Sequence, residues 1–224
     1  MTARKIIPRV LLYLVVLLIV VWTLAPYTWL VISSLSHKID LVTVPLKINL
    51  FHINLDNYRA LFTINGGESV NVTLFLHALQ NSTIISLSTM LICLPLGVMA
   101  AYAASRLKFK GSNGVILTSM ITQLVPPIVL VIPLYVIMRK FNLLDKQIGL
   151  ILVDISIGLP LVVWMMRGYL ASIPRDLEDA ARIDGCTYLG ALIRVILPLA
   201  GPGLVSVMIF AFIASWNEYL YAFI

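Results

Sequence analysis

A short acidic segment between Ser172 and Gly185 holds six charged side chains. These are Arg175, Asp176, Glu178, Asp179, Arg182 and Asp184. Such groups can form ion pairs with a protein partner. The sequence offers no Ser-His-acid set for nucleophilic catalysis and no cluster with metal-ligand spacing. It also lacks the G-x-x-x-x-G-K-[ST] loop that would hold ATP phosphates. The chemistry that these residues favour is therefore recognition and not covalent change, and neither an enzyme nor a metal site is expected.

The acidic segment carries consistent signals for a short helix. Ser172 is expected to cap its start, and Pro174 suits its first turn. Gly185 suits the left-handed residue that follows a helix end. Two oppositely charged pairs have the i,i+4 spacing that stabilises a helix: Arg175/Asp179 and Glu178/Arg182. A helix shorter than about 12–15 residues is marginal alone in water, so this one needs a surface to pack on.

Three surfaces are available to this helix. A helix on the bilayer usually carries a Lys- and Arg-rich polar face, whereas this segment has four acids against two arginines. A protein partner is therefore favoured over the membrane surface. Ala180 and Ala181 would permit close approach of a partner backbone, and Leu177 is placed to fill a pocket. The alternative is a solvated helix that packs on the chain's own spans.

The elements that must hold this segment are membrane helices. The 224 residues are 60% hydrophobic and only 12% charged, against about a quarter charged in soluble domains. Long apolar runs without period-two alternation predict transmembrane helices and not barrel strands. The first run is longer than the apolar part of a secretory signal. The fold class expected is an all-α, polytopic transmembrane helical bundle with five spans, at Val10–Ile32, Leu79–Ala104, Ser112–Met138, Ile148–Met166 and Leu199–Leu220.

The basic residues predict the orientation of these spans. With the polar segments on alternating sides, ten Lys and Arg residues share the side of the N-terminus and six lie on the other. The richer side is expected to be cytoplasmic, in the cell (inner) membrane. This places segment 33–78 outside and segment 167–198 inside. The same bias accounts for the net charge of +6, so nucleic acid is not an expected partner.

Five spans leave the C-terminus outside, and we expect that a sixth span is missing.

The acidic segment also resembles a known family signature. Asp179-Ala180-Ala181, then Gly185, Val195, Leu197 and Pro198, have the spacing of the EAA motif, the signature loop of the membrane subunits of ABC importers. Asp179 stands where Glu is usual, and Val195 where Ile is usual. The shorter Asp reaches about one methylene less toward a partner.

Other stretches resemble the carbohydrate-importing subgroup of that family, of the maltose-transporter type with six spans. They cover nearly the whole chain and comprise Leu55-Asp56-Asn57-Tyr58, Asn81-Ser82, Ala101-Tyr102-Ala103 through Arg106 to Gly111, and Trp216-Asn217-Glu218-Tyr219. The resemblance implies a type I importer permease fold in which residues 1–224 form a single domain. It implies the import of a sugar or sugar-like solute.

The resemblance also implies how the subunit works. The loop 172–198 would couple the chain to an ATP-binding subunit, through Leu177, Glu178, Asp179, Ala180, Ala181, Gly185, Leu197 and Pro198. The implied partners are a second permease subunit, two ATP-binding subunits, an extracytoplasmic solute-binding protein and the lipid bilayer. ATP and Mg would bind the ATPase subunits, and this chain would bind no cofactor. A channel or a secondary transporter is the rival reading, and a membrane enzyme is a third.

Three polar residues are candidates for the substrate pathway. Asp154 is the one acid well inside a predicted span, where a charge costs at least about 2.5–3.5 kcal/mol, so its side chain should face the bundle interior or a wet pathway. There it would accept a sugar hydroxyl. The alternative is a position near the outer headgroups, since Asp154 lies only seven residues beyond Gln147. Glu218 has the same ambiguity, and Asn217 lies beside it.

Overall fold

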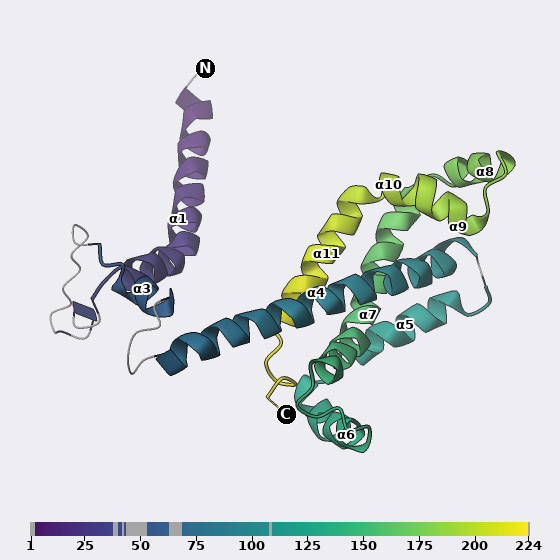
Figure 1. Ribbon diagram of the computed structural model, residues 1–224. Helices are drawn as coiled ribbons and strands as arrows, with labels where there is room; N and C mark the ends of the chain where they lie inside the picture. The colour runs from purple at the N-terminus through teal and green to yellow at the C-terminus, as the bar shows by residue number, and fades with distance from the viewer. Residues whose placement is uncertain are drawn as a thin grey trace. The chain divides into compact units, whose positions relative to one another are not determined.

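The computed structural model describes residues 3–37, 40, 41, 43, 53–62, 69–107 and 109–223. These residues form helices, turns and loops, with no strand among them. They divide into two compact units, residues 1–76 and 77–224. Figure 1 shows the helices of each unit. The all-α prediction is confirmed, while a large part of the outer segment 33–78 lies outside the described residues.

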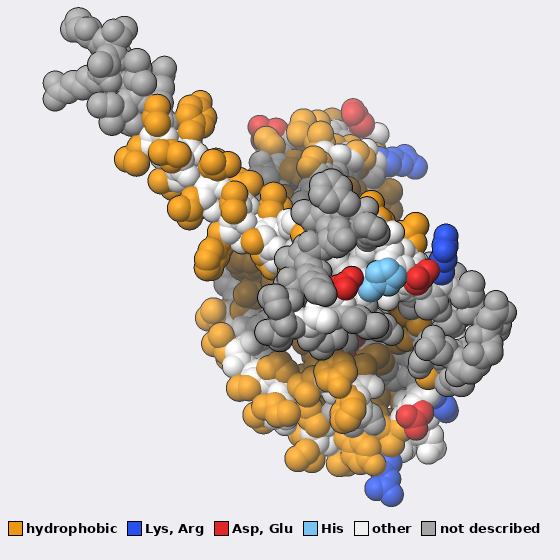
Figure 2. All heavy atoms as spheres, turned by 90° about the vertical axis from the view of Figure 1, so that its left-hand side faces the viewer, with side chains coloured by type: hydrophobic (Ala, Val, Ile, Leu, Met, Phe, Trp, Pro, Cys, Tyr) orange, Lys and Arg blue, Asp and Glu red, His pale blue; other side chains and the backbone are white. Residues whose placement is uncertain are grey.

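In the first unit the main element is α1, Ala3–Ser34. Its portion Val10–Ser34 has a mean hydropathy of 2.5, and none of it is buried. Exposed apolar side chains cover this helix from Val10 to Val31 (Figure 2). A helix that is apolar all round is typical of a lipid environment, and the first predicted span is confirmed as a helix that could cross a membrane.

A short helix, α3 (Asp56–Phe62), is tied to the end of α1. The Tyr58 hydroxyl lies 2.8 Å from the hydroxyl of Ser34, and Asn57 Nδ2 donates to the Ser34 carbonyl at 3.0 Å. The contact from Asn57 occupies the carbonyl of Ser34, which α1 leaves unpaired at its C-terminus. They give a structural role to the Leu55–Tyr58 stretch that the sequence analysis singled out.

Two long helices dominate the second unit: α4, Ser69–Arg106, and α7, Gln147–Ser172. Both are long and apolar enough to cross a membrane. Each is longer than predicted. The fourth span was expected to end at Met166, before the charged residue Arg167. The helix instead continues to Ser172. The charge of Arg167 is accommodated because its side chain donates to Asn113 Oδ1 at 2.5 Å.

The third predicted span is broken. Instead of one helix over 112–138, α5 (Ser112–Thr122) and α6 (Pro127–Lys140) meet at 97°. The physical reason is the pair Pro126-Pro127. Neither proline has a backbone N–H to donate to the preceding turn, and the backbone of Pro126 is extended, with ψ 129°. The prolines were expected to kink or break helices, but the size of the bend was not predicted.

The last part of the chain is also bent. α8 (Arg175–Ile183) is followed by one run of helix, Tyr188–Leu199, which comprises α9 (Tyr188–Ala191), a π-helical turn η1 (Leu192–Ile196) and α10 (Leu197–Leu199). This run meets α11, Gly201–Trp216, at 85°. The fifth span was predicted as Leu199–Leu220, but the helix starts after this bend and ends at Trp216. If each bent pair counts as one span, the described helices can cross a membrane five times, as expected.

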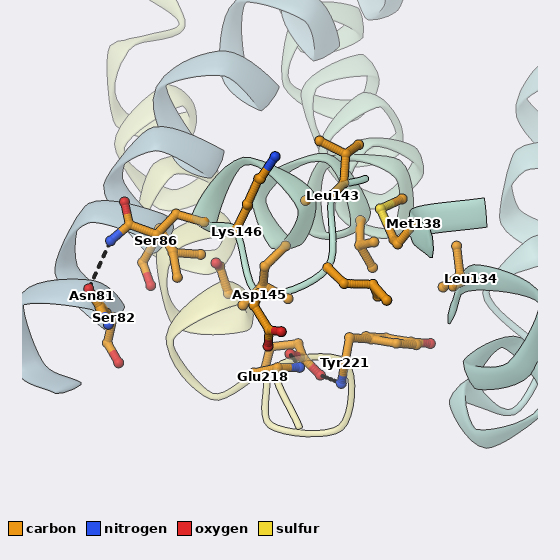
Figure 3. Close-up of a pocket in the computed structure, with 18 of the residues that line it drawn as sticks. Asn81, Ser82, Ser86, Leu134, Met138, Leu143, Asp145, Lys146, Glu218 and Tyr221 are labelled. Atoms are coloured by element: carbon orange, nitrogen blue, oxygen red, sulfur yellow. Dashed lines mark hydrogen bonds between the residues drawn. The ribbon is translucent and has the colours of Figure 1, made fainter. Parts of the chain in front are cut away.

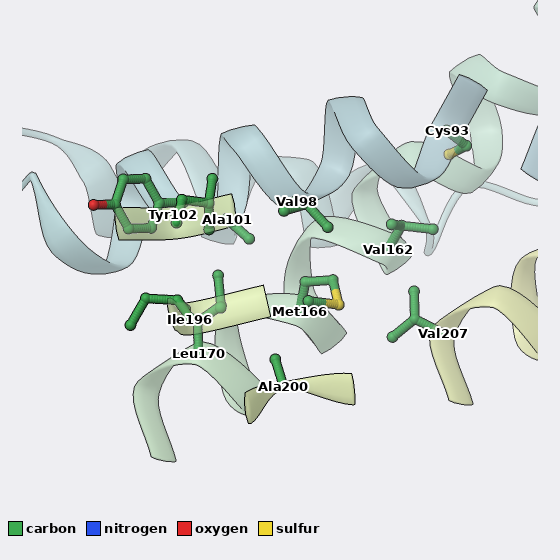
Figure 4. Close-up of a cluster of buried hydrophobic side chains, with 11 residues drawn as sticks. Cys93, Val98, Ala101, Tyr102, Val162, Met166, Leu170, Ile196, Ala200 and Val207 are labelled. Carbon is green, nitrogen blue, oxygen red and sulfur yellow. The ribbon is translucent and has the colours of Figure 1, made fainter. Parts of the chain in front are cut away.

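The core of the second unit lies where α4, α7, η1 and α11 meet (Figure 4). Its fully buried side chains include Cys93 of α4, Met166 and Leu170 of α7, Ile196 of η1 and Val207 of α11. The turn η1, which contains Val195 of the EAA-like motif, therefore packs directly on the two long helices. This packing gives the acidic helix α8 a fixed base.

Glycine allows the closest approach between α7 and α11. A Cβ built on Gly203 would overlap the ring of Tyr169, whereas one on Gly201 would meet open space. Small residues let membrane helices pack closely.

We expect Gly203→Ala to destabilise the subunit, because overpacking costs about 1–3 kcal/mol. The matched control Gly201→Ala should leave stability unchanged. The measurement is the thermal unfolding midpoint of the purified complex for both variants. Equal midpoints would show that the two helices do not meet at Gly203.

Candidate functional site

The acidic helix α8 begins later than predicted. It spans Arg175–Ile183, with Pro174 just before it. Ser172 is the last residue of α7, and its hydroxyl donates to the Tyr169 carbonyl, so it does not cap α8. The prediction of a Ser172 cap is wrong because α7 extends through this residue.

The end of α8 is as predicted. Gly185 has a φ of 91°, in the left-handed region. Its N–H donates to the Arg182 carbonyl at 3.1 Å, and the Cys186 N–H donates to the Ala181 carbonyl at 3.0 Å. Both bonds belong to the Schellman motif, which terminates a helix by pairing its last carbonyls. Gly185 therefore fixes where α8 stops.

One face of α8 is turned into the protein by a buried carboxylate. Glu178 is only 5% exposed. Its Oε1 accepts a hydrogen bond from the Tyr102 hydroxyl at 2.5 Å, and its Oε2 lies 3.4 Å from Nε of Arg106. A carboxylate is buried at tolerable cost only when it is paired and hydrogen-bonded. This pair anchors α8 to the end of α4.

Arg106 joins three helices at one point. Besides its ion pair with Glu178 of α8, its Nη2 donates to the carbonyls of Leu170 and Ile173, at 2.7 and 2.8 Å. These carbonyls lie at and just beyond the last turn of α7, where a helix dipole favours positive charge. The side chain of Arg106 therefore links the ends of α4 and α7 to α8.

The two i,i+4 pairs expected within α8 are replaced by contacts to other parts of the chain. Arg175 donates to the Ser105 carbonyl at 2.9 Å, and Arg182 lies over the ring of Tyr188, 3.9 Å from its centroid. Among the described residues, the ion pair of Glu178 is the one with Arg106. The prediction of internal pairs is wrong because Arg175, Glu178 and Arg182 each find a partner outside α8.

The other face of α8 is exposed. Asp176, Asp179, Ala180 and Ile183 recur at the spacing i, i+3, i+4, i+7, so they share one side of the helix. Ile183 is 86% exposed, and Leu177 beside this face is 42% exposed. We call these five residues the outward face of α8. Large apolar side chains exposed on a short acidic helix are typical of a protein contact surface.

The predicted coupling residues thus fall into two groups. Leu177, Asp179 and Ala180 lie on the outward face, whereas Glu178 and Ala181 point into the chain and are buried. Ala181 allows close approach to the chain's own helices, and not to a partner as the sequence suggested. In addition, Leu197 packs against the core and Pro198 is exposed. One face of the helix packs on the chain's own helices, as one of the two readings expected, and the other face is exposed.

A cavity of about 380 Å³ lies at the other end of the second unit (Figure 3). It is lined by the stretch 78–86 of α4, by the first turns of α7, by α6, and by the end of α11 with the turns after it. Asn81 of α4 accepts a hydrogen bond from Gln147 of α7 at 2.8 Å on its rim. Amides, carboxylates and the aromatic rings of Tyr135, Trp216 and Tyr221 line it together. We call it the outer cavity.

A second, smaller cavity of about 90 Å³ lies between α4, α7 and α11. Asp154 lines it, is 7% exposed, and accepts a hydrogen bond from the Ser215 hydroxyl through Oδ2. We call it the inner cavity. The side chain of Asp154 is therefore enclosed by the bundle.

The other two pathway candidates are engaged at the end of α11. The carboxylate of Glu218 accepts from the backbone N–H groups of Tyr221 and Ala222, at 2.7 and 3.0 Å. It lines both cavities. Asn217 Nδ2 donates to the Ile213 carbonyl at 3.0 Å, which closes the helix end. The structure therefore brings Asp154 and Glu218 to one region, and gives Asn217 a local role.

Comparison with known families decides the identity of the chain. Residues 93–222 match the family described as binding-protein-dependent transport system inner membrane component. The chain belongs to this family. The match covers the core, all of α8 and the part of each cavity lining that lies beyond residue 93. The subunit is not an enzyme, and its family implies ATPase subunits and a solute-binding protein as partners.

Individual relatives support the same assignment. The trehalose transport system permease protein SugB of Mycobacterium tuberculosis is 41% identical over 205 residues, which are 92% of this chain and 71% of the relative. The sulfoquinovosyl glycerol transport system permease protein SmoH of Agrobacterium fabrum is 35% identical over 199 residues, 89% and 67% of the two chains. Both are similar to this chain along most of its length.

A solved structure shows the same fold. It is a crystal structure of a bacterial ABC transporter involved in the import of the acidic polysaccharide alginate. The TM-score is 0.74 at 24% identity, and the match covers 98% of this chain and 74% of the other. The predicted fold of an ABC importer permease is confirmed.

Sequence reasoning missed the residues that anchor α8. Tyr102 and Arg106 lie in a stretch that was noted only for its resemblance to the family, and Arg106 was counted only as a basic residue on the cytoplasmic side. A signal was present, since a Tyr and an Arg at i,i+4 share one face of a helix. Nothing in the sequence indicates that this face meets Glu178, 72 residues further along the chain.

Proposed function

We propose that this chain is one of two permease subunits of an importer that carries a carbohydrate into the cytoplasm. The observation that carries the proposal is α8, whose inward face is fixed to the ends of α4 and α7 while its outward face is exposed. The names of the relatives, which concern trehalose and sulfoquinovosyl glycerol, support a carbohydrate solute.

The outward face of α8 is the docking surface for an ATP-binding subunit in this proposal. Leu177 and Ile183 supply apolar contacts, and Asp176 and Asp179 supply charge for basic groups on the ATPase. Two such ATPase subunits would bind ATP and Mg, and would serve this chain and a second permease subunit. A solute-binding protein would deliver the carbohydrate to the side that carries the outer cavity.

The buried anchor explains how a displacement of α8 would reach the membrane. Because Arg106 holds Glu178 of α8 and the carbonyls of Leu170 and Ile173 together, a displaced α8 moves the ends of α4 and α7 with it. Packed cores switch between discrete arrangements and do not deform continuously. Glu178, Arg106 and Tyr102 are therefore positioning residues that act through α8.

The orientation follows from the distribution of basic residues. We propose that the N-terminus and the segment 167–198 are cytoplasmic. In inverted vesicles stripped of the ATPase subunits, a cysteine placed at Ile183, which is 86% exposed, should then react with a membrane-impermeant maleimide. It should not react in intact cells. Labelling in intact cells would reverse the orientation.

The proposal is tested by reconstituting the complete transporter in lipid vesicles, with its solute-binding protein outside and ATP inside. Radiolabelled trehalose, maltotriose, diacetylchitobiose and sulfoquinovosyl glycerol are offered one at a time. We expect uptake of at least one of them that requires both ATP and the binding protein. ATP-independent uptake, or uptake of none of the four, would contradict the proposed function.

A further inference from the structure

Three buried polar side chains near the cavities have an oxygen atom without a hydrogen-bond partner in the protein. They are Ser86 and Thr89 of α4 and Asp154 of α7, which are 1%, 3% and 7% exposed. The unpaired atoms are the two hydroxyl oxygens and Oδ1 of the carboxylate. A buried polar group without a partner costs about 1–3 kcal/mol, so three such groups in one region point to a ligand that pairs with them.

Two other hydroxyl groups in these helices bond to the preceding turn. Thr83, on the same helix α4, donates to the Leu79 carbonyl at 2.7 Å. On α7, Ser156 donates to the Val153 carbonyl at 2.7 Å. Bonding to the preceding turn is the usual solution for Ser and Thr within a helix. The hydroxyls of Ser86 and Thr89 lack this bond although both side chains are buried.

The three groups line the two neighbouring cavities, which we together call the solute path. Ser86 lines the outer cavity, and Thr89 and Asp154 line the inner one. The two cavities share Ser215, Glu218 and Tyr221 in their linings. Figure 3 shows Ser86 on α4 and Glu218 and Tyr221 on the turn after α11, around the outer cavity. A solute that enters the outer cavity would reach the unpaired oxygens by moving deeper along this path.

The charge of the path selects among solutes. Two carboxylates line the inner cavity, Asp154 and Glu218, and no basic residue is among its described lining residues. Lys146 lines the outer cavity together with Asp145. A carboxylate accepts hydrogen bonds from hydroxyl groups but repels a sulfonate or another carboxylate, and this repulsion is strong where water is excluded.

We propose that Ser86, Thr89 and Asp154 form a solute site for a neutral, hydroxyl-rich sugar, and that this site rejects anionic sugars. Asp154 Oδ1 accepts a sugar hydroxyl, while the hydroxyls of Ser86 and Thr89 can donate or accept. This inference rests on the proposed function, because it assumes that the subunit imports a carbohydrate.

The first test compares neutral and anionic solutes in the reconstituted transporter. Trehalose and maltotriose are neutral, whereas sulfoquinovosyl glycerol and an alginate trisaccharide are anionic. We expect the fastest ATP-dependent uptake for a neutral sugar. Faster uptake of an anionic sugar would overturn the inference but leave the proposed function intact. Uptake of none of these sugars would count against both proposals.

The second test removes the unpaired groups one at a time and uses the sugar carried fastest. Asp154→Asn is expected to lower its maximal uptake about tenfold at saturating binding protein, since hydrogen bonds to charged groups are the stronger ones. Ser86→Ala and Thr89→Val should each lower it about threefold. The matched control is Thr83→Val, which removes a paired hydroxyl from the same helix and should leave uptake unchanged.

Stimulation of the ATPase by the loaded binding protein reports assembly in every variant. Retained stimulation together with reduced uptake supports the site. Uptake that stays at the wild-type rate in all three variants would overturn the inference, since water alone would then fill the path. Variants that reduce only assembly, with normal uptake per assembled complex, would also overturn it, because the groups would then pair with the second permease subunit.

Discussion

Replacing Arg106 with Met is expected to destabilise the subunit by about 3–5 kcal/mol, because the change leaves the charge of Glu178 buried without its partner. The same change removes the donors to the carbonyls of Leu170 and Ile173. The thermal unfolding midpoint of the purified complex measures the loss. Coupling should fall as well, seen as fewer solute molecules carried per ATP hydrolysed.

Two further variants separate the buried ion pair from a general effect of lost charge. Arg175→Met removes an arginine that donates to a single carbonyl, that of Ser105, and is exposed, so it should leave the midpoint nearly unchanged. The double variant Arg106→Met with Glu178→Gln removes both charges and should recover part of the lost stability. If Arg106→Met unfolds at the wild-type temperature, α8 is not anchored by this pair.

The second large effect is expected from Asp179→Lys. The residue lies on the outward face of α8 and makes no ion pair among the described residues. Reversing its charge should therefore leave folding and membrane insertion intact but weaken docking of the ATPase. We expect ATP-dependent uptake to fall at least tenfold, since truncating or reversing one partner of a close interfacial charge pair typically costs about 2–5 kcal/mol.

The matched control carries the same charge reversal on another exposed acid. Asp56 pairs with Arg59 at 3.7 Å on the surface, and both side chains are mostly exposed. Asp56→Lys should therefore leave uptake unchanged. Wild-type uptake in Asp179→Lys would remove this residue from the docking surface, whatever the control shows.

The apolar runs predicted the helices well, because length and hydropathy alone decide whether a helix can cross lipid. Their ends and bends were less predictable. Arg167 was taken as the end of a span, but a long basic side chain can find an acceptor while the helix continues. The break at Pro126-Pro127 was foreseen as a possibility, whereas its angle depends on the packing of α5 and α6.

The candidate site was predicted only in part, for a clear physical reason. The spacing of the EAA-like motif located α8 and its end at Gly185, both of which depend on local sequence. The burial of Glu178 depends on Tyr102 and Arg106, which are remote in the sequence. Likewise the unpaired oxygen of Asp154 depends on the meeting of α4, α7 and α11. Local patterns therefore locate the helix, while its inward face requires the structure.

The central claim is that the outward face of α8 contacts an ATP-binding subunit while the inward face does not. A photo-crosslinking amino acid at Ile183, which is 86% exposed, tests it directly in the assembled transporter, with the same group at Ala181, which is 8% exposed, as the matched control. We predict that irradiation joins the chain to the ATPase subunit from Ile183 and not from Ala181. Crosslinks from Ile183 to lipid or to this chain alone, with none to the ATPase, would contradict the account.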